Sequence, residues 1–133
     1  MPQWARGSDD ERAFVLQWVM TSIADVIQAQ VDAYNARDAE AFANCYSESA
    51  TVIGPDGSVM MTGRDAIASV YGQLFAQSPD LHVEIGTRIS AGDWVVDEED
   101  ASGINFEGMP PAMHALIVYH VSEGRIDRAQ MLA

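Results

Sequence analysis

The first third of the chain has apolar residues at helical spacing. They recur every three or four positions along residues 9–36, as on one face of a helix. Ser8, with Glu11 three positions later, is a capping-box pattern that marks a helix start. We therefore expect a helix over about 9–36, with a break near 21–22, and a short second helix over 39–46.

The rest of the chain changes from helical spacing to strand spacing. Two short apolar runs at 50–54 and 58–63 flank the turn-forming letters PDG and predict strands. Residues 64–77 return to helical spacing and predict a third helix. After Pro79 apolar and polar residues alternate, which is typical of strands with one buried face. Four strands are expected there, over 81–89, 93–103, 114–121 and 125–132.

Helices followed by an antiparallel meander define an α+β fold, with helices on one face of a curved sheet. A length of 133 residues fits one ordinary domain. The 20 acidic residues outnumber seven basic residues, all of them Arg, and give a net charge of -13. Such a charge repels phosphate backbones and anionic lipids, so we expect no nucleic-acid partner and no membrane partner.

Reactive side chains are sparse in this sequence. Without any Lys, Schiff-base chemistry on a lysine is excluded. Cys45 is the single cysteine, so an intrachain disulfide is impossible and a reducing, cytoplasmic location is expected. The N-terminal residues do not resemble a signal peptide. His82, His114 and His120 lack the spacing of metal ligands, so we predict no metal site and no cofactor.

The hairpin before the acidic run 97–100 fixes a register for its strands. A two-residue turn made by Gly92 and Asp93 matches the turns that join antiparallel strands. The resulting pairs are Ala91 with Trp94, Ile89 with Val96, and Arg88 with Asp97.

Alternation along the second strand then predicts which acids face the core. If Trp94 and Val96 lie on the core face, Glu98 and Asp100 share it, and Asp97 lies on the polar face. An inward Glu98 has three interpretations: it lies in water at a frayed strand end, it is paired internally, or it lines a pocket with a raised pKa. A β-bulge before residue 98 would exchange the two faces.

The segment "AYNARDAEAFANCYSESATVIGPDG…TGRDAIASVY" resembles the nuclear transport factor 2-like superfamily, which includes ketosteroid isomerases and SnoaL-like polyketide cyclases. The resemblance covers about residues 21–133, and leaves 1–20 as an N-terminal helical extension. It implies a cone-shaped domain, with three helices packed on a strongly curved, mostly antiparallel sheet. It also implies an apolar cavity at the open end and a homodimer formed through the convex face of the sheet.

Carried over residue by residue, the resemblance speaks against ketosteroid isomerase activity. The position of the isomerase's general base falls on Gly54, and the two oxyanion-hole positions fall on Gln30 and Ile117. Two supporting tyrosines have counterparts, Tyr46 and Tyr71. Because the base and both specialised donors are missing, we expect no isomerisation by that mechanism.

The resemblance agrees with the hairpin register in placing Glu98 inside the cone, as a tentative catalytic acid or base. The expected ligand-binding residues are Gln30, Tyr34, Tyr46, Tyr71, Val96, Asp100, Ile117, Tyr119 and Met131. We expect a small apolar or amphipathic ligand and leave three functions open. The first is an isomerase, cyclase or dehydratase that uses the pocket carboxylate. The second is a binding protein without turnover, and the third is a structural or interaction module.

Overall fold

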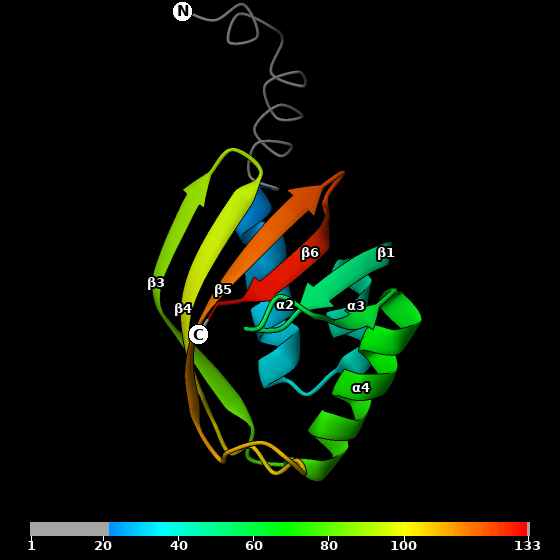
Figure 1. Ribbon diagram of the computed structural model, residues 1–133, viewed down its shortest axis with the longest axis vertical. Coiled ribbons are helices and arrows are strands. Elements are labelled where there is room, and N and C mark those ends of the chain that lie inside the picture. Colours follow the sequence, from blue (N-terminus) through cyan, green and yellow to red (C-terminus); the bar gives the residue numbers. More distant parts are fainter. Residues whose placement is uncertain (1–21, 133) are drawn as a thin grey trace, which may run out of the picture.

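The computed structural model of the protein describes residues 22–132. In this range three helices pack against one curved six-stranded sheet (Figure 1). The helices are α2 (Ile23–Asn35), α3 (Ala39–Asn44) and α4 (Arg64–Gln77). The α+β fold expected from the sequence is confirmed. The helical extension expected over 1–20 lies outside the described residues.

The helices begin where the sequence provides caps. At the start of α2 the Ser22 hydroxyl accepts a hydrogen bond from the Asp25 backbone N–H, and the Asp25 carboxylate accepts one from the Ser22 N–H. This capping box satisfies two backbone donors and starts a helix at the predicted break. Asp38 caps α3 in the same way, through the Ala41 N–H. Among residues 22–132, no helix combines the length and apolar character needed to cross a membrane.

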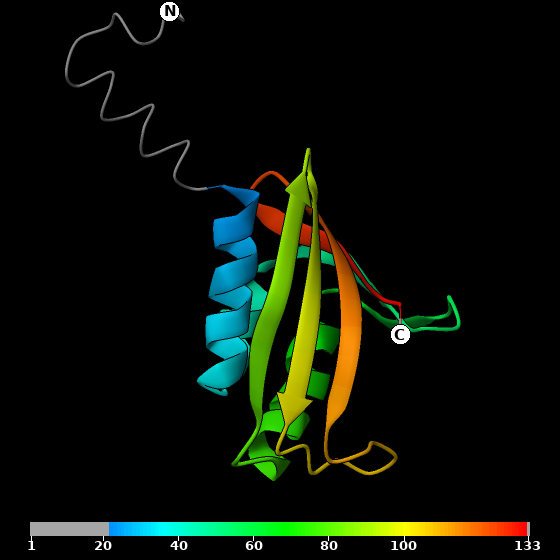
Figure 2. The ribbon, with the colours of Figure 1, turned by 90° about the vertical axis from the view of Figure 1, so that its left-hand side faces the viewer.

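The sheet has the order β2-β1-β6-β5-β4-β3. Its β1–β6 pairing is parallel and the other pairings are antiparallel. Figure 2 shows the long strands bent along their length, with α2 alongside β3. The strands are β1 (Tyr46–Ile53), β2 (Val59–Thr62), β3 (His82–Ala91), β4 (Trp94–Ser102), β5 (Met113–Ser122) and β6 (Arg125–Met131).

A bulge in β3 determines which side chains face the interior. The predicted hairpin pairs are all present, including Arg88 with Asp97, but Ile85 pairs with Glu99. Three residues of β3 therefore span the distance of two residues of β4, which reverses the alternation along β3 at this point. As a result Arg88 faces inward, and Ile89, which was expected in the core, is exposed.

The core lies between the helices and the inner face of the sheet. Five aromatic rings from α2, α3, β1 and α4 contact one another, with centroids 4.3–6.5 Å apart. Such distances are typical of favourable aromatic pairs. The rings belong to Tyr34, Phe42, Tyr46, Tyr71 and Phe75. This cluster holds α3 and α4 against the rest of the domain and forms one side of the interior.

Candidate functional site

A cavity of about 160 Å³ lies between the helices and the concave side of the sheet. Most of its wall is apolar. The polar side chains in the wall are those of Gln30, Glu99 and all four tyrosines, Tyr34, Tyr46, Tyr71 and Tyr119. An apolar cavity with a few convergent polar groups is the usual form of a small-molecule site.

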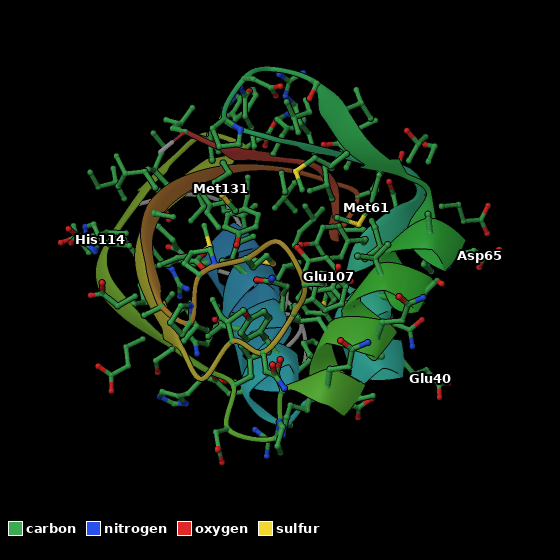
Figure 3. The ribbon with its side chains drawn as sticks, turned by 60° about the horizontal axis from the view of Figure 1, so that its bottom comes forward. Glu40, Met61, Asp65, Glu107, His114 and Met131 are labelled. Atoms are coloured by element: carbon green, nitrogen blue, oxygen red, sulfur yellow. The ribbon has the colours of Figure 1, made fainter. Side chains whose placement is uncertain are left out.

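Methionines make the cavity wall adaptable. Five of them line it, and they come from β2, β5, β6 and the loop between β4 and β5. Figure 3 looks into the open end of the cone, with Met61 and Met131 labelled. Methionine side chains are unbranched and polarizable, so they can adjust to ligands of different outline. The five are Met60, Met61, Met109, Met113 and Met131.

Glu99 is the carboxyl group in this wall. Its partly buried side chain comes from β4, and its Oε2 accepts a hydrogen bond from the Tyr119 hydroxyl at 2.8 Å. Burial raises the pKa of Glu99 from 4.5 to about 7, and the charge of Asp97 acts in the same direction. The hydrogen bond from Tyr119 and the charge of Arg88 lower this pKa in part. Near neutral pH both forms of Glu99 are populated, so it can accept or donate a proton.

A partly buried ion pair lies on the same face of the sheet as Glu99. Asp97 is fully buried, and Arg88 donates to both of its carboxylate oxygens, from Nε at 2.7 Å and from Nη2 at 2.9 Å. The remaining guanidinium nitrogen, Nη1, donates to Gln28 Oε1 on α2 at 2.8 Å. The pair therefore ties α2 to the sheet beside the cavity.

The tyrosine hydroxyls can act as neutral hydrogen-bond donors. Burial raises the pKa of Tyr71 to about 12, and it raises the pKa values of Tyr34, Tyr46 and Tyr119 above the ordinary value of 10.0. All four hydroxyls therefore remain protonated near neutral pH. A hydroxyl in an apolar wall is suited to bind an oxygen that gains negative charge during a reaction.

Comparison with known families places most of the chain in one of them. Residues 27–129, from α2 to β6, match the SnoaL-like domain. The chain belongs to this SnoaL-like family. A comparison with curated proteins gives no match.

Solved structures share the fold of this SnoaL-like domain at low sequence identity. An uncharacterized cystatin-fold protein from Novosphingobium aromaticivorans superposes with a TM-score of 0.77 at 23% identity, covering 84% of this chain and 98% of that one. A protein with a ketosteroid isomerase-like fold from Catenulispora acidiphila, solved with trimethylamine, has a TM-score of 0.65 at 21% identity, covering 80% of this chain and 82% of that one. IdmH from Streptomyces antibioticus, a proposed polyketide cyclase, has a TM-score of 0.66 at 22% identity, covering 83% of this chain and 90% of that one. The resemblance to nuclear transport factor 2-like proteins is confirmed.

Three residues expected inside the SnoaL-like cavity lie on the outer face of β4. Glu98, Val96 and Asp100 are absent from the cavity wall, so the predicted direction of their side chains was wrong. Glu98 Oε2 lies 3.3 Å from His114 Nε2, and Asp100 Oδ1 lies 2.5 Å from His114 Nδ1. Figure 3 shows His114 on the outside of the curved sheet. The reason is the bulge between Ile85 and Arg88 in β3, which exchanges the two faces. The sequence allowed for such an exchange by a bulge before residue 98, but did not place a bulge in β3.

The remaining expected residues do come together. Two lie on α2, one on β1, one on α4 and three on β5 and β6, and all of them line the same cavity. They are Gln30, Tyr34, Tyr46, Tyr71, Ile117, Tyr119 and Met131. The structure thus assembles a cavity from segments that are far apart in the sequence.

Glu99 was missed by one position in the sequence reasoning. The available signal was Gly86, a glycine in the middle of a strand, which commonly marks a bulge. With one extra residue placed between Ile85 and Arg88, Glu99 shares the inner face with the apolar start of β3. Gly86 also lies against the side chain of the outward Glu98. A Cβ atom at position 86 would be 2.8 Å from Glu98 Oε1.

A loop covers the open end of the cavity. Residues 103–112 connect β4 to β5 and cross in front of the opening, with Glu107 near its centre in Figure 3. Two side chains of the loop, Phe106 and Met109, belong to the cavity wall. Asn105 fastens the loop to the end of α4, because its backbone N–H donates to Ser78 Oγ at 2.9 Å. A ligand entering from this end therefore passes the loop.

The described histidines lie beside carboxylates outside the cavity. His82 is near Glu84, and His120 Nδ1 lies 2.6 Å from an oxygen of Asp127. Across residues 22–132, no three His, Cys, Asp or Glu side chains are grouped so that they could hold a metal ion. The polar groups in the cavity wall are carboxyl, phenol and amide groups.

Proposed function

We propose that the cavity binds a small, largely apolar ring compound and that Glu99 moves a proton at a carbon atom next to the carbonyl group of this compound. The observation that carries the proposal is the position of Glu99. Among the described residues that line the cavity, it is the one carboxyl, and most of the wall around the cavity is apolar. A carboxyl in such surroundings is a common choice for general acid–base chemistry.

The size of the cavity limits the ligand. An engineered cavity of ~150 Å³ in another protein accepts benzene, and this one measures about 160 Å³. The open end and the methionine wall allow a somewhat longer compound. A ligand with one or two rings therefore fits best.

The proposed reaction uses the two forms of Glu99. The ionised carboxylate takes a proton from the carbon, the electron pair of the C–H bond forms an enolate, and Glu99 becomes neutral. It then returns the proton to the same carbon or to another one. Tyr119 holds Oε2 in place, so Oε1 can receive the proton. The Tyr34 and Tyr71 hydroxyls in the wall can donate hydrogen bonds to the enolate oxygen.

Relatives support this class of chemistry without specifying the substrate. IdmH and a protein from Sinorhizobium meliloti, which share the fold at 22% and 20% identity, are both proposed polyketide cyclases. Cyclisations and isomerisations of this kind begin with proton removal next to a carbonyl group. The position of the base in this chain, Glu99 on β4, comes from its own geometry.

Hydrogen–deuterium exchange of 1-indanone in D2O tests the proposal. The CH2 group next to its carbonyl exchanges when a base removes a proton, and proton NMR follows the loss of the signal. We expect Glu99→Gln to reduce the protein-catalysed rate by roughly 10²-fold or more. The rate of the wild-type protein should rise with pH and level off above about pH 7, because the ionised form of Glu99 is the base.

Glu98→Gln is the matched control, because it changes the neighbouring acid on the outer face and should leave the exchange rate unchanged. Equal rates for wild type and Glu99→Gln would contradict the role of Glu99. Binding of 1-indanone without any exchange above the buffer rate would also contradict the proposed catalysis, and would favour a binding protein without turnover.

A further inference from the structure

Gln30 is a buried polar residue at the cavity wall. It lies on α2, one turn before Tyr34, and only 6% of it is exposed. Its neighbours in the wall are mostly apolar or aromatic. Glutamine is seldom buried unless both ends of its amide group are hydrogen-bonded.

One end of the Gln30 amide has no partner. Its Nε2 donates to the Tyr46 hydroxyl at 3.4 Å, whereas Oε1 is buried without any hydrogen bond. Burying an amide oxygen without a donor is unfavourable, and such cases in native proteins call for an explanation. Tyr46 is itself only 2% exposed. The amide nitrogen thus faces Tyr46, and the oxygen is the free end of the amide.

We propose that the ligand carries a hydroxyl or N–H group that donates a hydrogen bond to Gln30 Oε1. This inference rests on the proposed binding function of the cavity and adds a chemical requirement to it. The ligand is then an apolar ring compound with one hydrogen-bond donor, in addition to the carbonyl group at which Glu99 acts. Gln30 is a specificity-determining residue in this account.

Three compounds with the same ring skeleton test the inference. 1-Indanol can donate a hydrogen bond, 1-indanone can only accept one, and indane can do neither. We expect the wild-type protein to bind 1-indanol roughly 10-fold more tightly than the other two compounds, as measured by calorimetry or NMR titration. This comparison needs no substitution, so it does not depend on whether a variant folds.

Two variants identify the acceptor of the hydrogen bond. Gln30→Met keeps the length of the side chain and removes the amide, so the preference for 1-indanol should disappear. Glu99→Gln keeps an acceptor at position 99 without a charge, and the preference should persist. A preference that persists in Gln30→Met would show that another side chain accepts the hydrogen bond, and would overturn the inference.

The remaining outcomes separate this inference from the proposed function. Equal binding of all three compounds, together with exchange that depends on Glu99, would overturn the role of Gln30 alone, and would indicate a trapped water molecule as the donor to Oε1. Failure of all three compounds to bind would overturn both the inference and the proposed binding function.

Discussion

Glu99 and Glu98 differ in their surroundings although they are neighbours of the same type. Glu99 lies in an apolar wall under Tyr119, whereas the side chain of Glu98 is 37% exposed next to His114. Burial raises the pKa of Glu99 to about 7, so this carboxyl can exchange a proton near neutral pH. A shift of one position along a strand therefore decides which of the two acids is a candidate for proton transfer.

The partner of Asp97 could be predicted from the sequence, but not its burial. The hairpin turn at Gly92 fixes the pairing with Arg88, and this pairing is observed. The inward position of the Arg88–Asp97 pair depends on the extra residue in β3, because that residue turns Arg88 inward. Removing one member of a buried ion pair leaves an unpaired charge, so both residues are needed for a stable interior.

Regular elements were predicted well because their signals are local. Residues 64–77 form α4 as expected, since a helix is read from spacing within a few turns. The start of β1 was not predicted, because Tyr46 was placed in the preceding helix. Tyr46 instead pairs with Ile126, which is distant in the sequence. Pairing between distant strands, like the cavity that results from it, is not encoded in any short pattern.

The loop over the cavity depends on one glycine at its start. Gly103 follows β4 with a φ of 70°, and a Cβ atom there would overlap the Asp80 carbonyl group. Gly108, at the tip of the same loop, has a φ of 83° and open space around it. The two positions share a left-handed backbone and differ in crowding.

We expect Gly103→Ala to lower the free energy of unfolding by roughly 3 kcal/mol or more, because strain and backbone overlap add together. Gly108→Ala introduces only the backbone strain, and should lower the free energy of unfolding by about 1 kcal/mol. Urea denaturation followed by circular dichroism measures both values. Equal losses for the two variants would show that the Asp80 contact does not restrict the loop.

The outer face of the sheet carries exposed apolar side chains on a strongly acidic protein. Ile89 is 62% exposed, Trp94 43% and Leu116 39%, and they lie on the neighbouring strands β3, β4 and β5. Apolar residues grouped on a sheet face are commonly covered by a second copy of the chain. We propose a homodimer through this face. The net negative charge of each chain opposes association. Salt screens this repulsion and should therefore strengthen the dimer.

Light scattering at micromolar concentration and 150 mM salt tests the homodimer. We expect twice the mass of the 14.5 kDa chain for the wild type, and the mass of a single chain for Trp94→Asp. Val59→Asp places the same charge at an exposed apolar residue of β2 and should leave the mass of the wild type unchanged. A single-chain mass for the wild type would rule out the proposed dimer.

The central claim is that Glu99 faces an apolar cavity and changes its charge near neutral pH. Carbon-detected NMR of the side-chain carboxyl, with Glu99→Gln used to assign its signal, measures this directly. Because burial favours the neutral form, Glu99 should stay protonated well above pH 4.5 and lose its proton with a pKa of about 7. Titration of Glu99 near 4.5 would contradict the account, since its carboxyl would then be solvated and the cavity would lack its base.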